Sequence, residues 1–278
     1  MTGAYASHLP DGRLHLQHGP IDLVCEAWGQ ADAVQQGYRR AARRFAGVLA
    51  ELVADLAELR REGGRPAGVL GARMARAVAP FRPAFITPMA AVAGSVAEAV
   101  LAELAGPGIA KAYVNNGGDI ALHLATGESL TSAIAVPGAR PVTIPAASRV
   151  RGIATSGWRG RSWSFGIADA VTVLARTAAM ADAAATMIAN AVDLPGHPAI
   201  ARRPANSLQA DTDLGHRLVT TDVGPLTPDD IFTALDAGLA AADAFRARGL
   251  IDAAALFLQA ETRVSGTLLL PERENAHV

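Results

Sequence analysis

The chain of 278 residues contains a single cysteine, Cys25, and a single lysine, Lys111. One cysteine excludes an internal disulfide framework and a zinc site built from cysteines. Cys25 lies in an apolar, strand-like run, so we interpret it as a small core residue. The formal net charge is -1, so no excess of positive charge favours nucleic acid or an acidic membrane as a partner.

Long hydrophobic runs and a targeting segment are also missing. The most apolar stretch, Met89 to Leu104, is interrupted by Glu98 and Glu103. It falls short of the roughly 20 apolar residues that a membrane span needs. The first residues lack a basic start followed by an apolar segment, which argues against a secretion signal. We therefore predict a cytoplasmic protein without a membrane segment.

Half of the residues are hydrophobic, which is enough to bury a sizeable core. Alternation of apolar and polar residues predicts a β-hairpin at 13–28, and a period near 3.6 predicts a long helix at 31–62. The same criteria predict helices at about 68–78, 88–105, 178–192 and 228–248, strands at about 110–115, 119–124, 130–136, 151–157, 171–175 and 217–224, loops at 137–145 and 194–215, and a last strand or irregular segment at 252–265.

Strands and helices mix along the chain without strict alternation, which favours an α+β fold over a doubly wound sheet. We predict one domain, residues 1–278, in which mixed sheets pack with helices, and a loose tail at 271–278. The predicted helix at 88–105 carries small residues on nearly every face. It could pack inside the domain or between the subunits of a homodimer.

The stretch YVNNGGDIALHL, residues 113–124, places two amides, two glycines and a carboxylate between two strands. Such residues make a good hairpin turn, because glycine and asparagine accept positive φ. They could also form a ligand loop. In that case Gly117 and Gly118 would let backbone N–H groups approach an anion or a flat ring. Asn116 and Asp119 would then orient the ligand, and the residues leave both interpretations open.

The predicted helix TAAMADAAATMIANAV, residues 177–192, carries a polar stripe on an apolar background. Asp182, Thr186 and Asn190 are spaced by four, which puts them on one face. Buried, they would need partners. Aspartate and threonine oxygens suit Mg²⁺, which usually keeps waters and substrate phosphates as its other ligands. Alternatively, the stripe faces solvent, or Asp182 pairs with an arginine.

The segment TSGWRGRSWSFG, residues 155–166, gathers hydroxyls, tryptophans and arginines in a loop punctuated by glycine. Loops of this kind commonly carry binding sites. Arg159 and Arg161 could meet phosphates, and Trp158 or Trp163 could stack on a ring. A solvated loop with aromatic residues at its rim is the equally plain alternative.

Three stretches, VNNGGDI, GIATSG and VTVLARTAAMADAAATMIA, resemble in order and spacing the motifs of the ApbE superfamily. Its members are flavin-binding proteins, best known as FAD:protein FMN transferases. The resemblance covers about residues 110–192 well. It implies an ApbE-like fold, FAD and Mg²⁺ as cofactors, and transfer of FMN from FAD to a threonine or serine hydroxyl of a protein acceptor, with AMP leaving. The logic is that of phosphoryl transfer, in which a metal neutralises developing charge.

By the same resemblance, individual positions receive roles. Asp182 and Thr186 would be the Mg²⁺ ligands. The residues of the FAD pocket would be Asn116, Gly117, Gly118, Asp119, Thr155 and Ser156.

The chain departs from the transferases at one motif. Those proteins carry a histidine-containing segment that ends in Asp-Pro before the VTV strand, whereas this chain reads SFGIADAVTV. Asp169 could replace the histidine as catalytic base, although a carboxylate near its usual pKa is a weak base at neutral pH. The chain is most similar to the uncharacterised branch of the superfamily, protein family 0280, whose members share NGGDI and ADAVTV-type segments.

Three functions remain open on these residues. The first is a Mg²⁺-dependent enzyme acting on a flavin, with FMN transfer to a protein acceptor. The second is a module that holds a flavin or another small molecule for a partner. The third is an enzyme that acts on a different metabolite in a remodelled pocket.

Overall fold

The structure is a computed structural model that describes residues 3–133 and 141–267. Its large sheet is built from β1 (Tyr5–His8), β2 (Leu14–His18), β3 (Ile21–Gly29), β4 (Ile109–Asn116), β5 (Asp119–Leu124), β8 (Gly152–Ser156), β9 (Ala170–Ala175), β12 (Ala253–Leu258) and β13 (Glu261–Ser265). Within the described residues these nine strands follow one another across the sheet in that order. Two short ribbons accompany it: β6 (Ser129–Ser132) with β7 (Val142–Pro145), and β10 (Ile200–Pro204) with β11 (Leu218–Val223).

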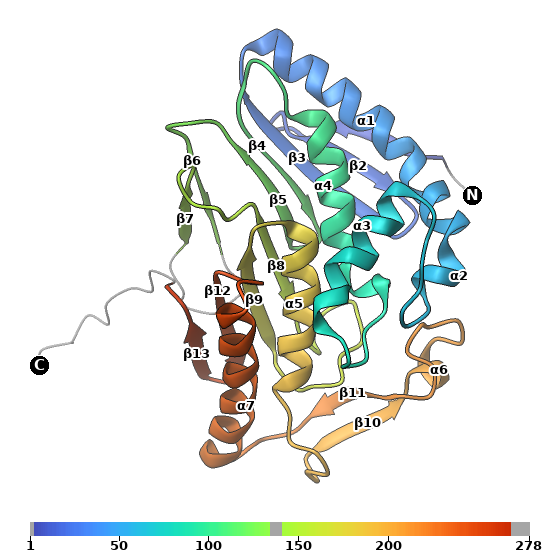
Figure 1. The fold of residues 1–278 in the computed structure, drawn as a ribbon, viewed down its shortest axis with the longest axis vertical. Helices are drawn as coiled ribbons and strands as arrows, with labels where there is room; N and C mark the ends of the chain where they lie inside the picture. The colour runs from blue at the N-terminus through green and yellow to red at the C-terminus, as the bar shows by residue number, and fades with distance from the viewer. Residues whose placement is uncertain (1–2, 134–140, 268–278) are drawn as a thin grey trace, which may run out of the picture.

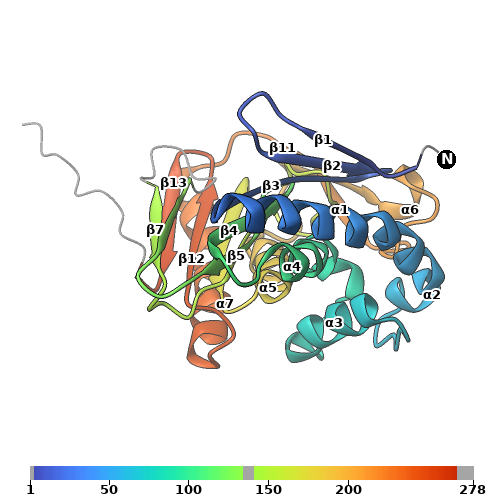
Figure 2. The same cartoon turned by 90° about the horizontal axis from the view of Figure 1, so that it is seen from above.

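Apart from the short helix α6, which lies beside the β10–β11 ribbon, the helices of the described residues lie on one side of the large sheet (Figures 1 and 2). The helices are α1 (Ala31–Ala54), α2 (Leu56–Leu59), α3 (Val69–Val78), α4 (Val92–Leu104), α5 (Ala178–Ala191), α6 (Ala205–Leu208) and α7 (Pro228–Ala247), with 3₁₀ turns at Ala79–Phe81 and Pro88–Ala91. The predicted α+β class is confirmed. The sheets are not mixed, however: every pairing in the described residues is antiparallel, because even the helical connections return the chain in the opposite direction.

Each face of the large sheet has its own hydrophobic core. The larger core joins the sheet to the helices and includes Phe45, Leu104 and Ile188. The smaller core lies under the β6–β7 ribbon and includes Leu122 and Ile153. Alternate residues of a strand point to opposite faces, so the strands at the centre of the sheet are apolar on both sides. This explains why the six residues of β9 are all buried and all apolar except Thr172.

The small residues of α4 pack inside the domain. Gly94 sits so close to the start of α5 that an added Cβ would clash with the carbonyl group of Ala178. The helix begins at Val92, after a 3₁₀ turn, and not at residue 88 as its sequence predicts. In the part of the chain that the structure describes, no helix is both long and apolar enough to cross a membrane.

Several predicted boundaries were wrong for identifiable reasons. The helix predicted at 31–62 breaks at Asp55, whose carboxylate accepts hydrogen bonds from the N–H groups of Ala67 and Gly68 and so turns the chain toward α3. The loop predicted at 194–215 contains β10 and α6. The sequence of β10, IARRP, has no clear alternation, and the strand forms because β11 pairs with it.

Two further predictions concern the ends of strands. Residues 142–145 of the predicted loop form β7, which pairs with β6. Residues 252–265 form the hairpin of β12 and β13. The rest of the loop at 137–140, the end of the predicted strand at 134–136, and the predicted tail at 271–278 lie outside the described residues.

Candidate functional site

The β4–β5 connection is a two-residue hairpin turn. Asn116 pairs with Asp119 across the turn, and the two residues between them have positive φ, 64° at Gly117 and 112° at Gly118. A two-residue hairpin favours this conformation, which is easiest for glycine. The side chain of Asn115 tightens the turn by accepting a hydrogen bond of 2.8 Å from the N–H of Gly118. The hairpin interpretation of this stretch is therefore confirmed.

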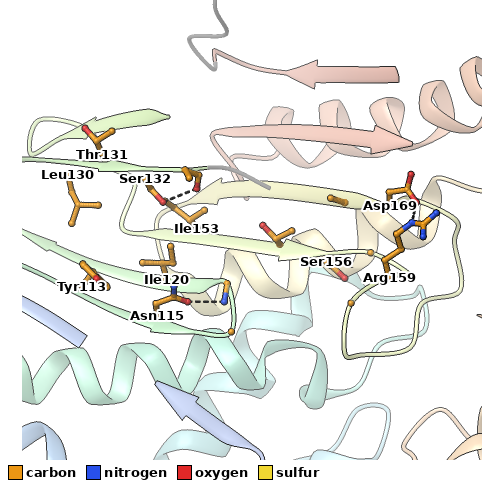
Figure 3. A pocket seen from close by; sticks show the side chains of 17 residues that line it. Tyr113, Asn115, Ile120, Leu130, Thr131, Ser132, Ile153, Ser156, Arg159 and Asp169 are labelled. Carbon is orange, nitrogen blue, oxygen red and sulfur yellow. Dashed lines mark hydrogen bonds and ion pairs between the residues drawn. The ribbon is translucent and has the colours of Figure 1, made fainter. Parts of the chain in front are cut away.

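The same turn borders a pocket of about 590 Å³ (Figure 3). The pocket lies on the face of the sheet that carries the β6–β7 ribbon. Its lining residues are Tyr113, Asn115, Gly117, Gly118, Ile120, Leu130, Thr131, Ser132, Ala133, Ile153, Thr155, Ser156, Gly157, Arg159, Gly160, Asp169 and Ala170. Ile120, Leu130 and Ile153 give one part an apolar wall, whereas Arg159 and Asp169 give the other a polar one.

Five of the predicted site residues line this pocket: Gly117, Gly118, Thr155, Ser156 and Asp169. The apolar part was missed, because a wall of isoleucine and leucine has the same pattern as any buried strand. The contribution of β6 was missed for a different reason. Nothing in its sequence, SLTS, indicates that it contributes to the wall of this pocket.

Asn116 and Asp119 point to the other face of the sheet, toward the helices. The amide of Asn116 donates a hydrogen bond of 3.1 Å to the carbonyl of Ala93, in the first turn of α4. The carboxylate of Asp119 accepts one of 3.1 Å from the N–H of Thr155. Because Thr155 lines the pocket, this hydrogen bond connects the pocket wall to the side chain of Asp119 on the helix side of the sheet.

Asp182 reaches the same place from α5. Its carboxylate accepts a hydrogen bond of 3.0 Å from the N–H of Gly94. Burial raises the pKa of Asp119 from its ordinary 3.8 to about 7, against smaller opposing effects of the Thr155 N–H and of Arg161. Burial also raises the pKa of Asp182 well above its ordinary value, and the neighbouring charge of Asp119 raises it further. Two carboxylates thus share one enclosed place and disfavour each other's charge.

We call Asp119, Asp182 and Thr186 the carboxylate corner. Thr186 lies one helical turn after Asp182 on the same face, is half-buried, and makes no hydrogen bond with its side chain among the described residues. No arginine pairs with Asp182 in the described residues, and its half-buried carboxylate accepts a hydrogen bond from the N–H of Gly94. The alternative of an ion pair with an arginine therefore does not account for this residue.

The third member of the stripe has a structural role. The side-chain oxygen of Asn190 accepts hydrogen bonds from the hydroxyl of Ser164 and from the N–H of Phe165. These bonds hold the segment before β9 against α5.

The donors of the carboxylate corner suit a hard divalent cation. In the described residues no group of three or more His, Cys, Asp or Glu side chains forms a metal site, so a cation here would need other oxygen ligands besides two carboxylates. Mg²⁺ is commonly bound in this way, by one or two carboxylates with waters and phosphates. A divalent cation would also offset the cost of burying both charged acids, and the charge of Asp119 that raises the pKa of Asp182 further.

Asp169 lies in a different environment, directly before β9. One carboxylate oxygen accepts hydrogen bonds from Trp158 Nε1 (3.1 Å) and Arg159 Nε (2.6 Å). The other accepts one of 2.6 Å from the N–H of Gln259, a residue with a positive φ of 51°. Three donors, one of which is the ion-paired Arg159, stabilise the carboxylate and occupy both of its oxygens. This arrangement favours a structural anchor over a free base.

The loop between β8 and β9 separates its two predicted phosphate-binding arginines. Arg159 pairs with Asp169 and lies over the ring of Trp158, 4.6 Å from its centroid. The guanidinium of Arg161 lies against Gly117, where an added Cβ would clash with it. Trp163 is exposed and does not line the pocket.

A family model described as AbpE bacteria matches residues 6–264. The UPF0280 protein of Archaeoglobus fulgidus is 39% identical over 107 residues, which make up 38% of this chain and 45% of the relative. The UPF0280 protein of Methanoculleus marisnigri is 46% identical over 128 residues, 44% of this chain and 50% of the relative. The chain thus spans about half the length of the curated relatives that it matches.

Solved structures give a weaker likeness. The apo form of the flavinyl transferase ApbE from Pseudomonas stutzeri aligns with a TM-score of 0.39 and 14% identity over 95% of this chain and 94% of that chain. The flavin transferase ApbE from Vibrio cholerae gives 0.38 and 14% over 94% and 97%. Values this low carry no argument about activity. The family model, however, covers nearly the whole sequence, and the protein therefore belongs to the ApbE family, in agreement with the resemblance of its three motifs.

Proposed function

We propose that this protein binds FAD in the pocket and Mg²⁺ at the carboxylate corner. The observation that carries the proposal is the β4–β5 turn. Gly117 and Gly118 line the pocket, and the next residue, Asp119, belongs to the carboxylate corner. One turn therefore adjoins a space with an apolar wall, suited to a ring system, and a pair of acids suited to a cation.

Each residue of the proposed site has a physical task. Asp119, Asp182 and Thr186 would hold the cation, which when bound supplies charge neutralisation for a diphosphate. Gly117 and Gly118 have no side chains, so a ligand can approach their backbone closely. Thr155 and Ser156 supply hydroxyls at the pocket wall, although the hydroxyl of Thr155 is 2.9 Å from that of Thr172 and shares a hydrogen bond with it.

FMN transfer is the reaction that the resemblance of the three motifs to FAD:protein FMN transferases implies, and membership of the ApbE family supports it for this chain. In that reaction a serine or threonine hydroxyl of a protein acceptor would replace AMP at the FMN phosphate. Asp169 remains our candidate for the group that takes the hydroxyl proton. To act so, its carboxylate would have to release one of its three donors.

The ion pair of Asp169 favours a second function, that of a flavin-binding module without catalysis. Asp169 is the acid of the pocket wall, and it is already ion-paired with Arg159. A pocket that binds FAD but lacks a free base would serve as a flavin-binding module for a partner protein.

Calorimetric titration with FAD, with and without Mg²⁺, tests the binding proposal. We expect Mg²⁺-dependent binding to the wild type and its loss in Asp119→Asn and Asp182→Asn. Asp229→Asn, which changes an exposed acid at the start of α7, is the matched control. No FAD binding under either condition would overturn the flavin proposal.

Transfer is tested separately by incubating the protein with FAD, Mg²⁺ and peptides that contain serine or threonine. AMP release together with a peptide that gains the mass of FMN would establish the transferase. Tight FAD binding without AMP release for any peptide would favour the binding module.

A further inference from the structure

Arg159 and Arg161 belong to the same exposed loop, but their guanidinium groups have different surroundings. Arg159 donates to Asp169 at 2.6 Å and stacks on Trp158, so both its charge and its flat face are engaged. The guanidinium of Arg161 makes no hydrogen bond or ion pair within residues 3–133 and 141–267. Its five N–H donors are therefore available to a ligand.

The position of Arg161 is set by the glycine turn. Its guanidinium lies against Gly117, where even a methyl group would clash with it. Gly117 is a pocket residue, and its second neighbour in sequence is Asp119 of the carboxylate corner. The guanidinium thus lies where the pocket and the carboxylate corner meet.

With a divalent cation bound at the carboxylate corner, the side chains around the Gly117–Gly118 turn would leave one positive charge uncompensated, which suits a diphosphate. One divalent cation would cancel the two carboxylates of the corner. The charge of Arg159 is already cancelled by Asp169. The guanidinium of Arg161 would then be the remaining positive charge beside the turn. A planar guanidinium is well suited to phosphate oxygens, because it can donate two parallel hydrogen bonds.

We propose that Arg161 is a positioning residue that binds a phosphate of a diphosphate ester lying across the Gly117–Gly118 turn. Arg159, by contrast, holds the loop in place. The inference rests on the proposed function in one respect, that FAD is the molecule supplying the diphosphate. The side chain of Arg161 recognises the diphosphate itself. The affinities for ADP and inorganic pyrophosphate should therefore depend on Arg161 as the affinity for FAD does.

The test measures binding by calorimetry in the presence of Mg²⁺. The proteins are the wild type, Arg161→Ala, Arg161→Lys and the control Arg43→Ala, which removes an exposed arginine of α1. The ligands are FAD, ADP, inorganic pyrophosphate and riboflavin, which has no phosphate. We expect Arg161→Ala to weaken binding of the three phosphate ligands by about 10- to 100-fold, the usual effect of losing a charged hydrogen-bond partner. Riboflavin binding should not change, and Arg161→Lys should recover part of the loss.

The outcomes separate this inference from the proposed function. If FAD and ADP bind Arg161→Ala as tightly as they bind wild type, the inference is overturned while flavin binding stands. If wild type binds pyrophosphate through Arg161 but does not bind FAD, the flavin proposal fails and the inference stands. If wild type binds none of the phosphate ligands, both are overturned. A fold defect is excluded when the melting temperatures of the variants match that of wild type.

Discussion

The carboxylate corner and Asp169 are two acidic regions of one site, and they differ in what surrounds the charge. Asp119 and Asp182 share an enclosed place, accept hydrogen bonds from backbone N–H groups, and raise each other's cost of ionisation. Asp169 is just as well enclosed, with 9% of its side chain exposed, but it has an arginine, an indole and a backbone N–H as donors.

This difference indicates which region is complete without a ligand. Buried acids without a cationic partner are costly, so they are retained where something else supplies the charge or where the proton itself has a use. Asp169 has its compensation within the fold. The carboxylate corner has no ion-paired cation among the described residues and is affected only by the charge of Arg161. We therefore expect ligand binding to change stability most at this corner.

The largest expected effect is on cation binding at the corner. Asp182→Asn keeps an oxygen that can accept from the N–H of Gly94 but removes the charge. A direct ligand should contribute at least as much as an outer-shell partner, whose loss costs about 10- to 100-fold in metal affinity. We therefore expect Mg²⁺-dependent FAD binding to fall by about 100-fold or more in calorimetry. Unchanged affinity would show that the corner is not the cation site.

The next effect concerns folding and the Asp169 region. Asp169→Ala leaves Trp158 Nε1, Arg159 and the N–H of Gln259 without their acceptor. Each lost partner of a buried donor costs about 1–3 kcal/mol, and the exposed Arg159 regains water, so we expect a loss of about 2–3 kcal/mol in the free energy of unfolding by urea. Asp182→Asn should cost much less in the metal-free protein. Equal losses in both variants would contradict the contrast between the regions.

A smaller effect per pH unit is expected in the pH dependence of stability. Because the folded protein holds the Asp119 proton up to about pH 7 while the unfolded chain loses it near 3.8, the folded state binds more protons in that window. Metal-free stability should therefore fall as the pH rises from about 4 to 7, by at most about 1.4 kcal/mol per pH unit for this one group. Asp119→Asn should flatten this part of the profile.

Added Mg²⁺ extends the same measurement. Protons and the cation compete for the carboxylates, so the rise in melting temperature on adding Mg²⁺ should be larger at pH 8 than at pH 5.5. A rise that is independent of pH, or that is kept in Asp119→Asn, would argue against a cation at this corner.

The smallest effect is expected at the turn that joins the two sides of the site. Gly117→Ala introduces a Cβ at positive φ and pushes on Arg161, which should cost about 1–2 kcal/mol in stability and also weaken FAD binding. In Gly118→Ala the strain is present, but no heavy atom lies within 4 Å of the added Cβ. FAD affinity should therefore suffer more at residue 117 than at residue 118. A greater loss of FAD affinity in Gly118→Ala than in Gly117→Ala would show that Arg161 does not contribute to ligand binding.

Local patterns predicted much of this structure. The hairpin at β2–β3, the helices α3, α5 and α7, and the Gly117–Gly118 turn follow from periodicity and from the need for positive φ. The resemblance to the family gave Asp119 a role in the FAD pocket and Asp182 a role as a metal ligand, and both roles stay predictions. The roles of Asn116, Thr155 and Thr186 toward a ligand stay predictions, which the binding experiments address.

Other features depended on partners far away in the chain. The break at Asp55 follows from its hydrogen bonds to the N–H groups of Ala67 and Gly68, and β10 exists because β11 lies beside it. No spacing in the sequence indicates that Gln259 would donate to Asp169 across 90 residues. For this reason the sequence suggested a free base where the structure has an anchored acid.

By itself, then, the sequence determined the family, the glycine turn and which side chains share a face of α5, because these depend on residues that are near neighbours. Packing between distant elements set three further features: Asp119 of β5 approaches Asp182 of α5, Arg161 lies on Gly117, and Arg159 forms an ion pair with Asp169. The physical reason is that charge compensation depends on distances between atoms of different elements. Those distances are set when the helices pack onto the sheet.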